Sequence, residues 1–140
     1  MPRTVGRDFG GSACRAALAA LVLLNATLGA VAAPAVPIRV GGDGDLPACG
    51  ERAVINDREA VDGRIEVNSG PARSFRPIDR LEPGTEVFLC DKDGTFLGII
   101  YGTGDCGLTE PLERRASYRG SCNSGWVHNR SLDPSVAGPV

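Results

Sequence analysis

Cysteine is the residue type in this chain whose chemistry is most directly predicted by its spacing. Five cysteines occur, and Cys14 lies in an N-terminal stretch that has the character of a secretion signal. Removing that stretch leaves an even number, as in small exported domains braced by disulfides. Disulfide pairing also withdraws the free thiol that a cysteine nucleophile needs. The four candidates are Cys49, Cys90, Cys106 and Cys122.

The other reactive side chains do not have the spacing of a metal site or a catalytic site. Zinc sites use close ligand pairs such as Cys-x-x-Cys, and no two cysteines here are that close. His128 is the only histidine, and we interpret it as structural because no Gly-x-Ser-x-Gly or Ser-x-x-Lys motif accompanies it. Glu110 and Glu113 lack the sugar-sized cleft that paired-carboxylate hydrolysis needs. We therefore expect no enzyme, no catalytic residue, no metal and no cofactor.

The first 32 residues have the order of a secretory signal peptide. Three arginines precede a charge-free run over 16–33, and Ala30-Val31-Ala32 supplies a small-x-small cleavage motif. We predict cleavage near Ala32-Ala33 and a periplasmic or secreted mature protein. The alternative is an uncleaved anchor, because the run is about as long as the shortest spanning helix, ~17 residues. That anchor is the one way in which we expect contact with a membrane.

Composition limits the partners of the exported part. The whole chain has a formal net charge of −2, and the predicted signal contains more basic than acidic residues, so the mature chain is more acidic still. Beyond Arg114-Arg115 it contains no basic run, whereas nucleic-acid binding needs a basic face. We exclude a nucleic-acid partner and expect a single domain that is a monomer.

The pattern between the flexible ends is that of strands. Residues 33–47 are rich in Pro, Gly and Asp, which predicts a flexible linker, and 133–140 is predicted to be a loose tail. In between, Ile65 and Val67 alternate with polar residues and should share one buried face. The β-rich runs 86–90 and 96–101 are joined through Asp93-Gly94, which is typical of a tight hairpin.

Further signals favour an all-β domain over 48–132. Glu82-Pro83-Gly84 predicts a turn, because Pro fixes φ and Gly accepts a left-handed second position. Residues 125–128 predict a short closing strand, with Trp126 in the core. Residues 56–61 are ambiguous between helix and strand. Short strands with frequent Gly and Pro indicate a small β-barrel.

Five short motifs occur in order along residues 64–132. They are Ile65-Glu66-Val67-Asn68-Ser69-Gly70-Pro71, the loop aromatic Phe75, Leu81-Glu82-Pro83-Gly84-Thr85-Glu86-Val87, Thr95-Phe96-Leu97-Gly98-Ile99-Ile100, and Gly125-Trp126-Val127 followed by Leu132. This order resembles the bacterial Src-homology-3-like domain family, whose pattern runs from an L-x-V-R-x-G-P strand to a closing G-W-V strand. The resemblance implies a small Src-homology-3-like β-barrel of about five strands.

The chain departs from the family pattern where that family binds its ligands. Asn68 stands where the family has Arg, Phe96 stands where it has Trp, and an insertion over 102–124 separates the last two strands. The resemblance implies a shallow groove lined by aromatic residues. Our candidates for that groove are Asn68, Phe75, Phe96, Tyr101 and Tyr118.

The insertion also suggests how the cysteines pair. Four cysteines allow three pairings. Cys106 and Cys122 flank the insertion, so we favour a bridge that pins it, together with a Cys49–Cys90 bridge that ties the segment before the first strand to the third strand. The other two pairings stay open.

The resemblance implies a non-enzymatic binding module of the bacterial cell envelope. Its ligand is expected to be a peptidoglycan peptide or a segment of a partner protein, bound through the groove and the inserted loop. One alternative is a small secreted protein that blocks another protein with its braced insertion. A cell-wall hydrolase accessory is the third, and this chain has no room for the catalytic domain.

Overall fold

The described part of the chain is built from β-strands, which confirms the predicted all-β class. The computed structural model describes residues 6, 31–45 and 47–139, with residues 134–139 described by their backbone alone. Cys14 and nearly all of the predicted signal peptide lie outside the described residues. No α-helix occurs in the described ranges. The elements are β1 (Arg39–Val40), β2 (Glu51–Ile55), β3 (Ile65–Asn68), β4 (Pro77–Leu81), β5 (Glu86–Asp93), β6 (Phe96–Tyr101), β7 (Ala116–Ser117), β8 (Asn123–His128), the 3-10 helix η1 (Asn129–Ser131) and β9 (Leu132–Pro139).

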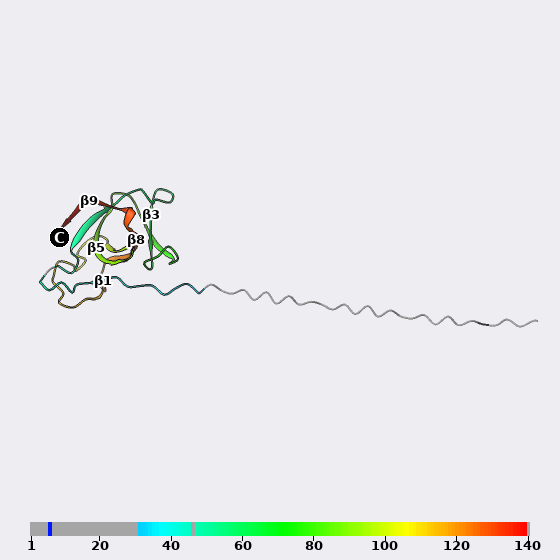
Figure 1. Cartoon of the computed structure of the whole chain (residues 1–140), viewed down its shortest axis with the longest axis horizontal. Helices are drawn as coiled ribbons and strands as arrows, with labels where there is room; N and C mark the ends of the chain where they lie inside the picture. Colours follow the sequence, from blue (N-terminus) through cyan, green and yellow to red (C-terminus); the bar gives the residue numbers. More distant parts are fainter. Residues whose placement is uncertain (1–5, 7–30, 46, 140) are drawn as a thin grey trace, which may run out of the picture. The chain divides into compact units, whose positions relative to one another are not determined.

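Seven of the strands form one antiparallel sheet in the order β4-β3-β8-β6-β5-β2-β9. β1 and β7 form a separate two-stranded sheet, in which Arg39 is paired with Ser117. Figure 1 shows the larger sheet as a strongly curved layer, with β9 and β3 on opposite sides of the view. Strands that are distant in sequence therefore surround a common interior, and about five predicted strands become nine across the described residues.

The strongest strand predictions are confirmed at the level of single residues. Ile65 and Val67 of β3 are both buried, as their period-two spacing predicts. β5 and β6 form a hairpin in which Asp93 is paired with Phe96. The two turn residues are therefore Gly94 and Thr95, one position later than the Asp-Gly step suggests. Only Gly94 of the two has a positive φ, 58°, which is the pattern of a type II′ turn.

The buried side chains form two clusters. The first core lies inside the curved sheet and consists of Ala53, Ile55, Ile65, Val67, Leu81, Val87, Ile99, Tyr101, Val127 and Leu132. The second core joins the other face of β6 and β8 to the N-terminal segment and the insertion. It consists of Ile38, Val40, Ala48, Cys49, Phe96, Ile100, Cys106, Leu108 and Trp126.

The predicted linker over 33–47 is wrong for its central part. The Val36 amide donates to the Ser69 carbonyl oxygen at 2.7 Å, and the Tyr118 amide donates to the Ile38 carbonyl oxygen at 2.8 Å. Ile38 and Val40 are buried in the second core. The prediction was wrong because the Pro and Gly residues around them are typical of a flexible linker. The strand forms because its partner, β7, is supplied by the insertion more than seventy residues later.

Two further boundaries also differ from prediction. The tail predicted to be loose forms β9, an edge strand antiparallel to β2 in which Leu132 is paired with Ile55. Residues 57–59 of the ambiguous stretch form a bend and a turn, so the stretch is neither helix nor strand apart from an isolated bridge between Val61 and Arg64. In both places the local pattern was too short or too polar to indicate a partner strand.

The favoured disulfide pairing is confirmed. Cys49 is bonded to Cys90, and Cys106 is bonded to Cys122. Both bridges belong to the second core or pack against it. Trp126 is also confirmed as a core residue, and its indole N–H donates to the Val36 carbonyl oxygen at 2.8 Å.

Candidate functional site

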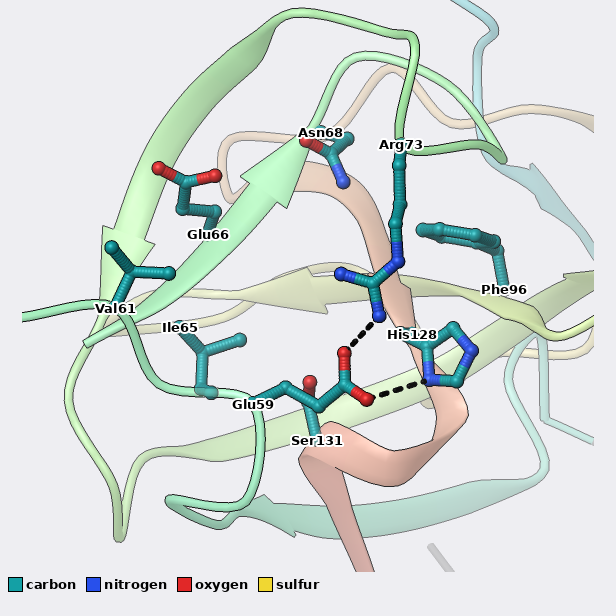
Figure 2. Close-up of a pocket in the computed structure, with 9 residues that line it drawn as sticks. All are labelled: Glu59, Val61, Ile65, Glu66, Asn68, Arg73, Phe96, His128 and Ser131. Carbon is teal, nitrogen blue, oxygen red and sulfur yellow. Dashed lines mark hydrogen bonds and ion pairs between the residues drawn. The ribbon is translucent and has the colours of Figure 1, made fainter. Parts of the chain in front are cut away.

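A small pocket lies where β3, β6 and β8 meet the turn after β2 and the loop after β3. Its volume is about 100 Å³. We call it the Glu59 pocket, because the Glu59 carboxylate lies at its centre in Figure 2. It is lined by Glu59, Val61, Ile65, Glu66, Asn68, Arg73, Phe96, His128 and Ser131.

Two short loops position the central charges. Asn56 begins the turn after β2, and its side-chain oxygen accepts from the Arg58 amide at 3.0 Å, an Asx-turn that places Glu59 over the sheet. The loop over 69–76 is closed by the Ser69 amide, which donates to the Arg76 carbonyl oxygen at 2.9 Å. Arg73 extends from that loop toward Glu59 (Figure 2). The strands fix the pocket walls, and these loops supply its ions.

Both oxygens of Glu59 face a basic side chain. Oε2 accepts from the Arg73 guanidinium, and Oε1 lies 3.7 Å from His128 Nδ1. The Glu59 side chain is 16% exposed, whereas that of Arg73 is 70% exposed. The acid is therefore held inside the pocket while its principal cation reaches across the mouth from solvent.

His128 has two competing partners for one ring nitrogen. Its Nδ1 accepts from the Arg130 amide at 3.3 Å and so caps η1. The same atom faces Glu59, and that ion pair requires a proton on the ring. Neutral imidazole can cap the helix, and imidazolium can pair with Glu59, but one nitrogen cannot do both. The ring also meets Phe96 edge-on, with centroids 5.4 Å apart.

Two further polar side chains line the pocket beside the ion pair. One is the Asn68 amide, whose nitrogen points into the pocket in Figure 2. The other is the Ser131 hydroxyl, on a residue that is only 2% exposed. Glu66 is paired with Arg80 at 3.0 Å. The buried side-chain atoms that lack a hydrogen-bond partner among the described residues, Asn56 Nδ2 and Ser69 Oγ, belong to residues outside this lining.

The structure brings together two of the five predicted groove residues, Asn68 and Phe96. Phe75 lies instead over Gly70 of its own loop, where an added Cβ would meet its ring at 2.4 Å. Tyr101 is buried in the first core, and its hydroxyl donates to Asp79 at 2.9 Å. Burial, and then the hydrogen bond and the charge of Asp79, raise the pKa of Tyr101 well above the ordinary value for tyrosine.

Tyr118 serves the insertion rather than a groove. Its hydroxyl donates to the Cys106 carbonyl oxygen at 2.9 Å and accepts from the Cys122 amide at 3.1 Å. The hydroxyl thus satisfies backbone groups at both ends of the Cys106–Cys122 bridge. A tyrosine that brackets an insertion looks like a contact residue in sequence, but here its polar end is already used by the protein itself.

Sequence reasoning missed the two charged residues at the centre of the site. Glu59 and Arg73 belong to short polar stretches that resemble ordinary solvated loops. His128 was noticed but interpreted as structural, and its cap on η1 fits that interpretation. The signal that joins these residues is their contact across two loops, which no local pattern contains.

The arrangement suits binding rather than nucleophilic chemistry. In the described ranges, no hydroxyl or thiol is hydrogen-bonded to His128, so a nucleophile–base pair is not formed there. The four cysteines of the described fold are all in disulfides. Among the same residues, no group of three His, Cys, Asp or Glu side chains lies close enough to hold a metal ion.

A second hollow of about 450 Å³ lies at the end of the first core. Its floor is apolar and includes Ala53, Leu89, Leu97 and Leu132. The Glu59 pocket instead contains a carboxylate that is largely shielded from solvent and faces two basic side chains, which makes that pocket the stronger candidate for specific recognition.

Nothing in the described part of the chain is a helix that is both long and apolar enough to cross a membrane. Comparison of the chain with protein-family models, with curated proteins and with solved structures finds no match.

Proposed function

We propose that this protein is an exported, non-enzymatic binding module of the bacterial cell envelope, with a Src-homology-3-like barrel that recognises a peptide through the Glu59 pocket. The observation that supports this proposal most is a set of polar and aromatic side chains gathered in one pocket with strand walls. Asn68, Ser131 and Phe96 line it together with the Glu59–Arg73 ion pair. Binding sites typically present a small number of precisely placed polar groups on a preformed surface.

The fold and the compartment support the same proposal. A curved antiparallel sheet with short strands and tight turns is compatible with a Src-homology-3-like barrel. Two intramolecular disulfides are compatible with the oxidising space outside the bacterial cytoplasm. Disulfides also keep a small domain rigid, so less conformational entropy is lost when a ligand binds.

A peptide is the ligand that matches the pocket's mixture of groups. A peptide presents amide donors and acceptors together with charged ends or side chains, and the pocket presents an amide, a hydroxyl, carboxylates and a guanidinium. Peptides of the cell wall are accessible to an exported protein in large amounts. We therefore expect the cell-wall peptide to be the ligand, with a peptide segment of an envelope protein as the alternative.

The test is co-sedimentation of the disulfide-bonded protein with purified peptidoglycan. We expect the wild type to sediment and Asn68→Ala to sediment markedly less. Asn123→Ala is the matched control, because Asn123 is an exposed asparagine on β8 outside the pocket. Absence of sedimentation, or equal sedimentation of wild type and Asn68→Ala, contradicts the proposal. Capture of a protein that depends on Asn68 selects the partner-protein alternative.

A second candidate function is supported by the insertion. Residues 109–115 are exposed, and the Cys106–Cys122 bridge braces the segment that contains them. A braced exposed loop suits a protein that blocks a partner. A Glu113→Ala/Arg114→Ala variant that loses a protein partner, while Asn68→Ala keeps it, would favour this function over the pocket.

A further inference from the structure

We propose that the Glu59 pocket takes a primary ammonium group on a flexible side chain of its peptide ligand, and that Arg73 occupies this place in the free protein. This inference rests on the binding function proposed above. It assigns a chemical class to the ligand and a role to a residue that the sequence did not single out.

Three of the groups that line the pocket can accept hydrogen bonds from an ammonium ion. The Glu59 carboxylate is the principal one. The Ser131 hydroxyl is the second, and it belongs to a residue that is only 2% exposed. The Asn68 amide is the third, because a half-turn of the amide would present its oxygen in place of the nitrogen that points into the pocket in Figure 2. An ammonium has three donors, which these acceptors match in number.

Arg73 behaves as a ligand supplied by the protein's own loop. Its guanidinium binds Glu59 from solvent, and most of its side chain stays exposed. Figure 2 shows it crossing the opening from the loop above to reach the carboxylate. Because the Arg73 side of this pair is solvated and can be screened by water, an incoming cation can displace it. The exchange replaces one cation by another, and Glu59 is never left buried without a counter-ion.

The charges around the pocket disfavour an anionic ligand. Glu59 and Glu66 both line it, and Arg73 is already engaged by Glu59. His128 faces the same Glu59, while Arg80 faces Glu66. A carboxylate that approached Arg73 would meet two carboxylates of the protein within the same small space. An ammonium meets attraction from both.

The experiment is an NMR titration of the disulfide-bonded protein with three probes that share one backbone. They are Nα-acetyl-lysine methylamide, its Nε-acetylated neutral form, and Nα-acetyl-glutamate methylamide. We expect the lysine probe to shift the side-chain signals of Asn68 and Arg73, and the other two to leave them unchanged. Arg73→Gln should tighten binding of the lysine probe about two- to fivefold, because it removes the competing guanidinium, whose side chain is mostly solvated. Glu59→Gln should weaken it at least about tenfold, the scale of a charge-assisted hydrogen bond.

Arg64→Gln is the matched control. Arg64 is also a partly exposed arginine paired with a glutamate, Glu82, at 3.0 Å, but neither residue lines the pocket. The Arg64→Gln variant should bind the lysine probe as the wild type does.

Weaker binding of the lysine probe by Arg73→Gln, or preference for the glutamate probe, overturns the inference. If peptidoglycan binding depends on Asn68 while the lysine probe does not bind, the inference fails and the proposed function stands. If the probe binds and peptidoglycan does not, the ammonium site stands without that function.

Discussion

The two cores of this molecule are built in opposite ways. The first core consists of Tyr101 and aliphatic side chains from neighbouring strands, with no cysteine among its members. The second core gathers residues from β6 and β8, the N-terminal segment and the insertion, and includes Cys49 and Cys106. Each disulfide joins a residue of the second core to one that lies in or against it. Crosslinks are concentrated where the chain has the least regular secondary structure.

This difference shows what the disulfides accomplish. The sheet can bury a continuous apolar face by itself. The second core depends on two segments that are distant in sequence and whose strand pairing, β1 with β7, is only two residues long. Crosslinks constrain the unfolded state most where loops are long, and so they stabilise contacts that local structure cannot supply. We expect the two cores to respond differently to the changes below.

The largest effect is expected from Trp126→Ala, which removes the side chain that links the second core to β8. Trp126 is buried, and its indole N–H holds the N-terminal segment through Val36. Truncating a buried tryptophan costs about 3–5 kcal/mol. Denaturant unfolding should show the loss as a lower midpoint. An unchanged midpoint would place Trp126 outside the core and remove the distinction between the two regions.

Opening either disulfide should follow in size. The chain-entropy relation gives roughly 4 kcal/mol for Cys49–Cys90 and roughly 3 kcal/mol for Cys106–Cys122 as paired Ser substitutions. Because Leu108 of the insertion is buried in the second core, opening Cys106–Cys122 should disturb more than a surface loop. We expect faster amide exchange at Tyr118, whose N–H is bonded to Ile38, than at Ile99 of the first core.

The outcome that contradicts this expectation is specific. If the Cys106/Cys122 variant keeps full exchange protection at Tyr118, the insertion is an added loop and the second core does not need its bridge. If protection is lost equally at Tyr118 and Ile99, the two cores unfold as one unit and do not differ in stability.

The strand packing of the first core was predictable from the sequence, whereas for the second core only the disulfides and Trp126 were, for one physical reason. The local alternation of Ile65 and Val67 with polar residues predicts their buried face. The conformational freedom of Gly94 predicts the hairpin turn. Ile38 and Val40 also alternate, but the proline and glycines beside them are typical of a linker. Their burial depends on Leu108 and β7 of the insertion, and such long-range pairing is absent from any local window.

The candidate site was predictable to the same limited extent. Asn68 and Phe96 were both predicted as groove residues from the family resemblance, and both line the Glu59 pocket. Glu59 and Arg73 are on loops whose meeting depends on an Asx-turn and on loop closure at Ser69. Tyr101 and Tyr118 were predicted as groove residues because they bracket the insertion, whereas their hydroxyls are hydrogen-bonded to Asp79 and to the Cys106 carbonyl oxygen.

Gly98→Ala tests the packing of β6 against the N-terminal segment, and we expect a smaller loss of stability. A Cβ at this position on β6 would lie 2.7 Å from Asp91 Cβ and 2.8 Å from Ile38 Cδ1. Asp91 cannot move freely, because its carboxylate accepts from the Arg39 amide and from Arg115. Overpacking of this kind costs about 1–3 kcal/mol. Gly50→Ala, which meets nothing within 4 Å, is the control and should be nearly neutral in the same unfolding experiment.

The smallest expected effect is that of Tyr101→Phe, which changes one polar contact of the first core and leaves its packing in place. At neutral pH the variant loses the hydrogen bond to Asp79. Asp79 is exposed and water can replace the lost donor, so the cost should be about 1 kcal/mol. A loss as large as that of Trp126→Ala would show that the first core, too, depends on a single anchoring residue.

The same substitution has a pH dependence whose sign follows from the raised pKa of Tyr101. Burial, followed by the hydrogen bond and charge of Asp79, raises that pKa above the value of the unfolded chain, which is about 10 for tyrosine. Above about pH 10 the folded protein therefore holds a proton that the unfolded chain releases, and stability falls as the pH rises. Below about pH 10 the contribution is complete. The free energy of unfolding of the wild type should decline more steeply than that of Tyr101→Phe from about pH 10 upward. Parallel declines would mean that another group governs alkaline unfolding, and that the interior of the curved sheet is open enough to solvate a phenolate.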